Sequence, residues 1–186
     1  MRIFSGEFKG RILKTPKGRA TRPTKGILRE AVFNICQEQI EGAAFLDLFA
    51  GSGSMGFEAI SRGARFTVFV EQDAQAIRCI RENFQLLQVE ERSQLLSMNV
   101  FAALSQLQKK KLLFDLIYID PPYKQETALI SDLLIKLTPL LNEESLVFIE
   151  TSAHEKEMSQ IGKLQLKDMR IFGISRLSQF TVHPSQ

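Results

Sequence analysis

The order of apolar runs after residue 43 constrains the fold more than any other feature of this 186-residue chain. Five short apolar runs rich in β-branched and aromatic residues are typical of buried strands, and we expect them at 44–49, 66–71, 94–98, 114–119 and 145–150. The stretches between them have helical spacing, which predicts helices at 55–62, 73–88, 100–108 and 126–141. This alternation predicts an α/β fold in which helices cover a mostly parallel sheet.

The two ends of the chain add further elements. An earlier helix is expected at about 27–40, with Thr24 as its N-cap. Near the other end, two strand-like stretches meet at Gly173 and predict an antiparallel edge of the sheet. The sequence shows no internal repeat.

Composition places the chain among ordinary soluble domains, with 44% hydrophobic and 24% charged residues. The two cysteines, Cys36 and Cys79, lie far apart without metal-ligand spacing, so we expect buried thiols and neither a disulfide nor a metal site. The N-terminus has no apolar leader and no run is long enough to cross a bilayer. We therefore expect a cytoplasmic monomer that does not associate with membranes.

Positive charge is concentrated at the N-terminus. Residues 1–29 hold nine Lys or Arg and one acid, whereas acids outnumber basic residues in the remainder. A basic arm on an acidic body indicates contact with a polyanion. Alternation of apolar and basic residues around Gly6 and Gly10 favours a small β-hairpin; the alternative is a solvated leader. We divide the chain into a basic arm at 1–26 and a main domain at 27–186, and expect Arg11, Lys14 and Arg22 of the arm to contact RNA.

Unusual residues lie at the ends of four of the expected strands. Asp47 lies near the end of the first, which is followed by the loop "AGSGSMG"; Glu71 ends the second, Asn99 follows the third, and "DPPY" at 120–123 follows the fourth. Ligands of such sheets bind outside the carboxyl ends of the strands. The sequence therefore predicts one site at this edge.

The loop "GSGSMG" at 51–56 matches a GxGxxG nucleotide fingerprint and allows two ligands. Gly51 and Gly53 would let the backbone approach a ligand, and Glu71 could accept both ribose hydroxyls. A dinucleotide would place its pyrophosphate here, but the Asp47 carboxylate would disfavour that charge. Asp47 better suits the ammonium and sulfonium of S-adenosylmethionine. The competing interpretation of Asp47 is a buried, hydrogen-bonded structural acid.

The segment "DPPY" combines four residues with complementary chemistry. Each proline fixes its own φ and extends the residue before it, and neither can donate to a sheet. The result is a stiff ledge carrying the Asp120 carboxylate, the Pro121 carbonyl and the ring of Tyr123. Such a ledge suits a planar group with an NH2. The plainer interpretation is a Pro-Pro turn with a solvated acid.

Several motifs together resemble one known family. They are "MRIFSGEFKGR", "TPKG", "RPT", "LREAVFN", "FLDLFAGSGSMGFEAISRGA", "VFVEQD", "YIDPPY" and "FGISRLSQF", and they cover nearly the whole chain. The combination is similar to the bacterial 16S rRNA guanine-N2 methyltransferase family of the RsmD type. "DPPY" alone also occurs in adenine, cytosine and glutamine methyltransferases.

This resemblance implies a Rossmann-like methyltransferase fold and methyl transfer from S-adenosylmethionine to N2 of a guanine in small-subunit rRNA. The methionine part of the cofactor would contact Asp47, Gly51 and Gly53. Its ribose would contact Glu71, and its adenine would contact Asn99. Asp120, Pro121 and Tyr123 would hold the target base. The chain departs from the family where the pattern reads "RPTTDRVRE", because here the segment is "RPTKGILRE", with Lys25, Gly26 and Ile27.

Two other functions fit parts of the sequence. One is a DNA adenine-N6 methyltransferase, although the chain has little room for a target-recognition domain. The other is a non-enzymatic RNA-binding protein on the same fold, against which stand the intact Gly51, Gly53, Glu71 and Asp120.

Overall fold

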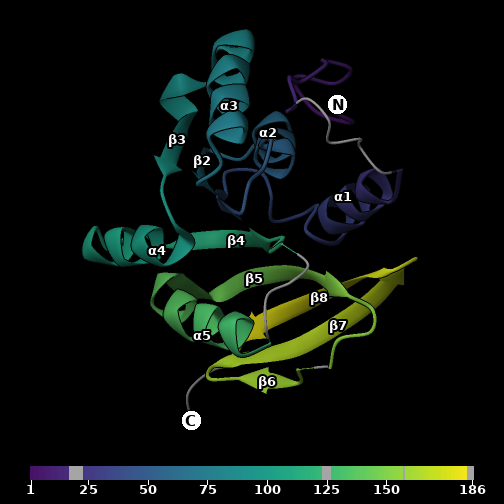
Figure 1. Ribbon diagram of the computed structural model, residues 1–186, viewed down its shortest axis with the longest axis vertical. Coiled ribbons are helices and arrows are strands. Elements are labelled where there is room, and N and C mark those ends of the chain that lie inside the picture. The colour runs from purple at the N-terminus through teal and green to yellow at the C-terminus, as the bar shows by residue number, and fades with distance from the viewer. Residues whose placement is uncertain (17–22, 123–126, 157, 184–186) are drawn as a thin grey trace.

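The computed structural model describes residues 1–16, 23–122, 127–156 and 158–183 (Figure 1). Within these residues the chain forms an eight-stranded sheet in the order β3-β2-β1-β4-β5-β8-β7-β6. The strands are β1 (Ala44–Leu48), β2 (Phe66–Glu71), β3 (Ser93–Ser97), β4 (Phe114–Ile119), β5 (Leu141–Ser152), β6 (Gln160–Ile161), β7 (Leu164–Phe172) and β8 (Ser175–Val182). Neighbours among β1 to β5 pair in parallel, and β8, β7 and β6 pair antiparallel. The predicted fold class is confirmed.

Helices cover both faces of the sheet (Figure 1). They are α1 (Pro23–Ile35), α2 (Ser54–Ser61), α3 (Ala74–Leu87), α4 (Val100–Lys109) and α5 (Thr127–Leu137), with short 3-10 turns at Glu90–Arg92 and Thr138–Leu140. Side chains alternate along β1: Phe45 packs toward α1 and α2, whereas Leu46 and Leu48 pack toward α4 and α5. Because the central strands are buried on both faces of the sheet, their sequences are continuous apolar runs.

Several predicted boundaries were wrong. The first helix begins at Pro23, so Thr24 lies in its first turn and is not the N-cap. Proline is well suited to that position, because its fixed φ is helical and its missing N–H has no partner in the first turn anyway. β5 begins earlier than predicted, and the two-residue strand β6 was not predicted.

The N-terminal arm, residues 1–16, is folded. An antiparallel bridge joins Arg2 to Ile12, and the Ile3 N–H donates to the Arg11 carbonyl at 3.0 Å. The side chains of Ile3 and Leu13 are buried against α2 and α3. For these residues the predicted hairpin is present in minimal form, and the solvated-leader interpretation is wrong.

Backbone groups dock the arm on α2. Glu58 is fully buried and accepts hydrogen bonds from the N–H groups of Phe4 (2.9 Å) and Ser5 (3.0 Å). Gly6 has a φ of 82°, and a Cβ there would lie 1.6 Å from the Ser61 carbonyl oxygen. The arm can approach α2 this closely because residue 6 has no side chain.

Candidate functional site

The strand register brings the predicted residues to one edge of the sheet. Leu48 pairs with Ile119 of β4 and with Val70 of β2, so these strands end side by side. The Asp120 N–H points to the Leu48 carbonyl at 3.4 Å. Strand order reverses between β1 and β4, which is where open α/β sheets bind their ligands.

The glycines of the loop after β1 have different roles. Gly53 and Gly56 lie against aromatic rings, because a Cβ on either would come within 3.0 Å of Phe69. A Cβ on Gly51, whose φ is 57°, would meet nothing within 4 Å. Gly53 and Gly56 therefore allow close packing, and Gly51 faces open space. The packing role of Gly56 was not anticipated from the sequence.

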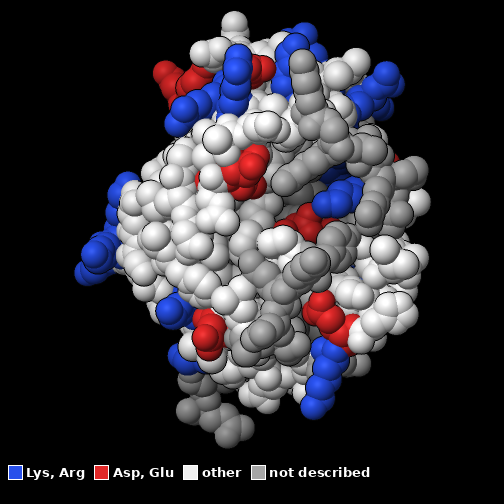
Figure 2. Space-filling view, in the orientation of Figure 1, with Lys and Arg blue, Asp and Glu red and all other residues white. Residues whose placement is uncertain are grey.

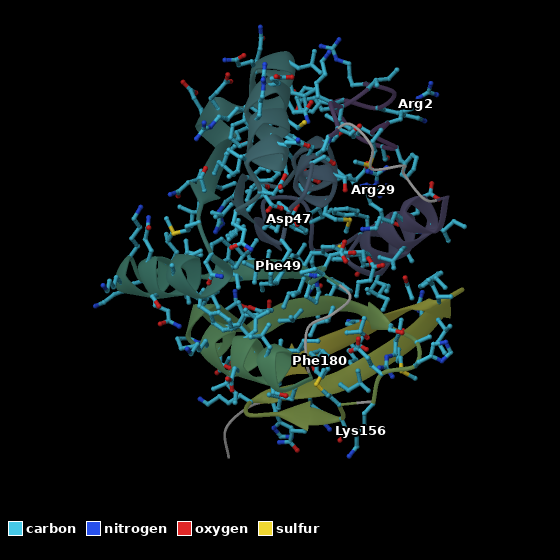
Figure 3. All side chains as sticks on the ribbon, in the orientation of Figure 1. Arg2, Arg29, Asp47, Phe49, Lys156 and Phe180 are labelled. Atoms are coloured by element: carbon cyan, nitrogen blue, oxygen red, sulfur yellow. The ribbon has the colours of Figure 1, made fainter. Side chains whose placement is uncertain are left out.

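Asp47 is a buried carboxyl in the middle of the molecule, between α2 and β4 (Figure 3). It accepts a hydrogen bond from the Gly56 N–H at 2.9 Å. Burial raises the pKa of Asp47 to about 8; the Gly56 N–H opposes the shift, and the Asp120 and Glu71 carboxylates add to it. A bound cation would favour the ionised form of a carboxyl whose pKa is raised in this way. Its bond to Gly56 also shows that Asp47 shapes the loop, so both predicted roles are compatible with the geometry.

Glu71, at the end of β2, is bonded to three backbone N–H groups. Its Oε2 accepts from Gly51 at 2.7 Å, and its Oε1 accepts from Gln72 at 2.7 Å and Asp73 at 2.9 Å. A carboxylate has about four acceptor positions, so this arrangement leaves room for one further donor. Two ribose hydroxyls would require one backbone bond to open.

Two asparagines border the same edge. Asn99 is exposed and caps α4, because its Oδ1 accepts from the Phe101 N–H at 2.9 Å. Asn83 of α3 is fully buried and was missed by sequence reasoning. It accepts from the Lys14 N–H at 2.8 Å, and its Nδ2 donates to the carbonyls of Lys14 (3.1 Å) and Ser52 (3.4 Å). Asn83 thus connects the arm to the glycine loop; a polar residue on a buried helix face was the available signal.

The ledge after β4 carries a charge pair. Asp120 Oδ2 lies 2.8 Å from Nζ of Lys25 in the first turn of α1. Burial raises the pKa of Asp120; Lys25 opposes that shift and Glu150 adds to it. Pro121 is buried, and no donor in the described part of the chain bonds its carbonyl. Tyr123 lies outside the described residues.

A buried carboxylate, that of Glu150, lies next to this ledge. Glu150 at the end of β5 accepts hydrogen bonds from the Tyr118 hydroxyl and the Ser175 hydroxyl, each at 2.9 Å. Glu150 also lines a small cavity with Pro121 and Pro122. Sequence reasoning did not assign Glu150 or Ser175, although "FGISRLSQF" supplies the second.

The RNA-binding residues predicted in the arm are only partly described. Arg11 and Lys14 are exposed, and Arg22 lies outside the described residues. Arg29 is not an available cation, because it is buried over the Phe4 ring and donates to the Arg2 carbonyl at 2.8 Å (Figure 3).

Comparison with known proteins identifies the family. The model of a family described as "Conserved hypothetical protein 95" matches residues 1–181. The chain belongs to this family. Among curated proteins, it is 33% identical over 175 residues to "Putative rRNA methyltransferase YlbH" of Bacillus subtilis (strain 168), covering 94% of this chain and 95% of that protein. It is 30% identical over 151 residues to "Ribosomal RNA small subunit methyltransferase D" of Escherichia coli (strain K12), covering 81% and 74%. The resemblance to the RsmD type is confirmed.

Solved structures confirm the fold. "Putative methyltransferase yhhF from Escherichia coli" superposes with a TM-score of 0.87 at 26% identity, covering 100% of this chain and 99% of that one. The fold is the Rossmann-like methyltransferase fold. Among the described residues, no helix is long and apolar enough to span a membrane, and no group of three His, Cys, Asp or Glu side chains could hold a metal ion.

Proposed function

We propose that this protein transfers a methyl group from S-adenosylmethionine to the exocyclic N2 of a guanine in small-subunit (16S) rRNA. The observation that carries the proposal is the pairing of Leu48 with Ile119, which puts the glycine loop and the Asp120 ledge next to each other. A donor on one and a base on the other would be in contact. The names of the curated relatives support rRNA as the substrate.

The donor binds along the ends of β1, β2 and β3. Asp47 faces its cationic methionine part, and Gly51 and Gly53 let the chain turn around it, both with positive φ. Glu71 accepts from the ribose, and exposed Asn99 contacts the adenine edge. The geometry fits a ligand with cations and hydroxyls and no phosphate.

We expect Glu71→Ala to weaken S-adenosylmethionine binding by about 1–3 kcal/mol, because the change removes a charged hydrogen bond to the ribose. It also frees the Gly51 N–H, which Glu71 holds at 2.7 Å, so part of the loss comes from the loop itself. Calorimetry on the purified variant measures the effect. Glu82→Ala is the matched control, since Glu82 pairs with Arg78 on the exposed side of α3. Unchanged affinity in Glu71→Ala would place the ribose partner elsewhere.

The target base binds on the ledge. The Asp120 carboxylate and the Pro121 carbonyl accept the two hydrogens of the guanine NH2, and Tyr123 stacks on the ring, which contributes about 1–3 kcal/mol per base. A base paired inside a duplex cannot reach this position, so the target is unpaired or flipped out.

Alignment accounts for most of the catalysis. The donor supplies an electrophilic methyl group on a sulfonium. The N2 lone pair is delocalised into the guanine ring, and Asp120 favours the positive charge that develops on N2 as it attacks. Holding N2 in line with the carbon–sulfur bond contributes several kcal/mol. The new N–C bond forms as the carbon–sulfur bond breaks, and N2 loses a proton to Asp120 or water.

The arm contacts the phosphates of the RNA. Figure 2 shows basic side chains at the end of the molecule where the arm and α3 lie, and Arg2, Lys9, Arg11 and Lys14 are exposed there. Backbone hydrogen bonds hold the arm on the body, so its cationic side chains are available to a ligand.

We expect replacement of Arg11, Lys14 and Arg22 by Gln to flatten the salt dependence of RNA affinity by about one unit of slope per lost phosphate contact. S-adenosylmethionine affinity should not change, because the arm is held by main-chain groups. Fluorescence titration of rRNA at several salt concentrations measures both affinity and slope. Lys109→Gln with Lys110→Gln removes exposed charge at the end of α4 and serves as the control. A wild-type slope in the triple variant would contradict a phosphate-binding arm.

Nucleoside analysis of rRNA tests the proposal as a whole. Small-subunit rRNA from cells lacking the gene should lose one N2-methylguanosine, and the purified protein should restore it. Methyl transfer to duplex DNA and not to rRNA would favour the DNA adenine-N6 alternative. Failure to bind S-adenosylmethionine would favour the non-enzymatic alternative.

A further inference from the structure

A cation from the first turn of α1 lies at this site. Lys25 Nζ lies 2.8 Å from Asp120 Oδ2, although the two residues are 95 positions apart. Their side chains are 48% and 21% exposed, so the pair faces a ligand arriving at this edge. Figure 2 shows acidic and basic atoms next to one another near the middle of this face.

The position of Lys25 is fixed by the rest of α1. Leu28, Val32 and Phe33 are buried in the core, and a Cβ on Gly26 would lie 3.3 Å from the Phe4 ring. The helix therefore holds the lysine backbone in place. The ammonium reaches Asp120 from the more exposed side of the pair, so a guanine that offers N–H donors to the Asp120 carboxylate would compete with Lys25 for it.

Guanine offers the complementary groups. Its N2 and N1 carry hydrogens and its O6 is an acceptor, and the three follow one another along one edge of the base. Two carboxylate oxygens followed by an ammonium match that order. Lys binding to guanine O6 is also common in nucleic-acid recognition.

We propose that Lys25 is a specificity-determining residue that donates a hydrogen bond to O6 of the target guanine while Asp120 accepts from N1 and N2. This inference rests on the proposed function, because it assumes guanine N2 as the methylated atom. Binding O6 orients the base so that N2 faces the donor.

The first test is single-turnover methyl transfer to small-subunit rRNA from cells lacking the gene. Lys25→Met keeps the aliphatic stem and removes the donor, and it should slow transfer about tenfold or more. Lys25→Arg keeps a donor and should retain most of the rate. Lys109→Met, at an exposed lysine of α4, should leave the rate unchanged. Unchanged or faster transfer by Lys25→Met would overturn the inference; faster transfer would show that Lys25 only masks Asp120.

The second test changes the base instead of the protein. In an rRNA fragment with 6-thioguanine at the target position, sulfur replaces O6 and both N–H donors remain. The wild-type enzyme should slow about tenfold on this fragment, whereas Lys25→Met should show little further loss. Equal losses from the sulfur in both enzymes would show that Lys25 does not bind O6.

Product analysis tests the Lys25 contact with O6 separately from the proposed methylation of guanine N2. If wild-type enzyme and Lys25→Met form N2-methylguanosine at the same rate, the O6 contact is wrong and the proposed function stands. If the wild-type product is any other nucleoside, both are wrong.

Discussion

Asp120→Ala is expected to lower methyl transfer on the order of a hundredfold or more, because it removes a pre-organised charged acceptor from the reacting nitrogen. Affinity for S-adenosylmethionine should stay close to wild type, since Asp120 belongs to the ledge after β4 and Asp47 and Glu71 remain in place. The two measurements are single-turnover transfer to rRNA and calorimetry with the donor. A combined loss of both would indicate a collapsed site.

Two comparisons make this result interpretable. Asp132→Ala removes an exposed acid of α5 and should have no effect. Asp120→Ala also leaves Lys25 without its 2.8 Å partner, so a separate effect of the lysine must be considered. The double variant with Lys25→Met distinguishes the cases, because removing the lysine would restore activity only if loss of its bond to Asp120 caused the defect. Full activity in Asp120→Ala would contradict a base-binding ledge.

Much of this site could be predicted from local sequence because its parts lie at strand ends. Asp47, Glu71 and Asp120 each lie in or directly after the last residues of an apolar run that is recognisable alone, and parallel pairing then brings the ends together. The same reasoning located the glycine loop. It could not separate Gly51, which faces open space, from Gly53, whose missing side chain makes room for Phe57 and Phe69.

The missed residues depend on tertiary contacts that leave no local pattern. Lys25 meets Asp120 across 95 residues, and Glu150 meets Ser175 through an antiparallel pair. Asn83 joins the arm to the Ser52 carbonyl only because three separate segments meet. The charge count that identified the arm also included Arg29, which is buried. The charge count therefore predicted that the arm contacts a polyanion, but it could not predict which Lys and Arg side chains are exposed.

Asp47→Asn is expected to stabilise the free protein above neutral pH while weakening donor binding. The pKa of buried Asp47 is raised to about 8, from about 3.9 in an unfolded chain. The folded state therefore holds its proton more tightly, and this stabilisation is complete below about pH 4. It is lost as pH rises from about 4 to about 8. Asparagine has no proton to lose, so the variant avoids this loss.

The stability difference should therefore grow with pH. It should reach about 2–5 kcal/mol at pH 9 and shrink toward zero near pH 4, as measured by urea unfolding without donor. Asp132→Asn, at an exposed acid of α5, should follow the wild-type curve. At fixed neutral pH, calorimetry should show S-adenosylmethionine bound about tenfold or more weakly by Asp47→Asn, because asparagine cannot give up a proton and become the negative charge that the donor's cation favours. A gain in stability without weaker binding would make Asp47 a structural acid of the glycine loop, held by Gly56, with no part in binding the methyl donor.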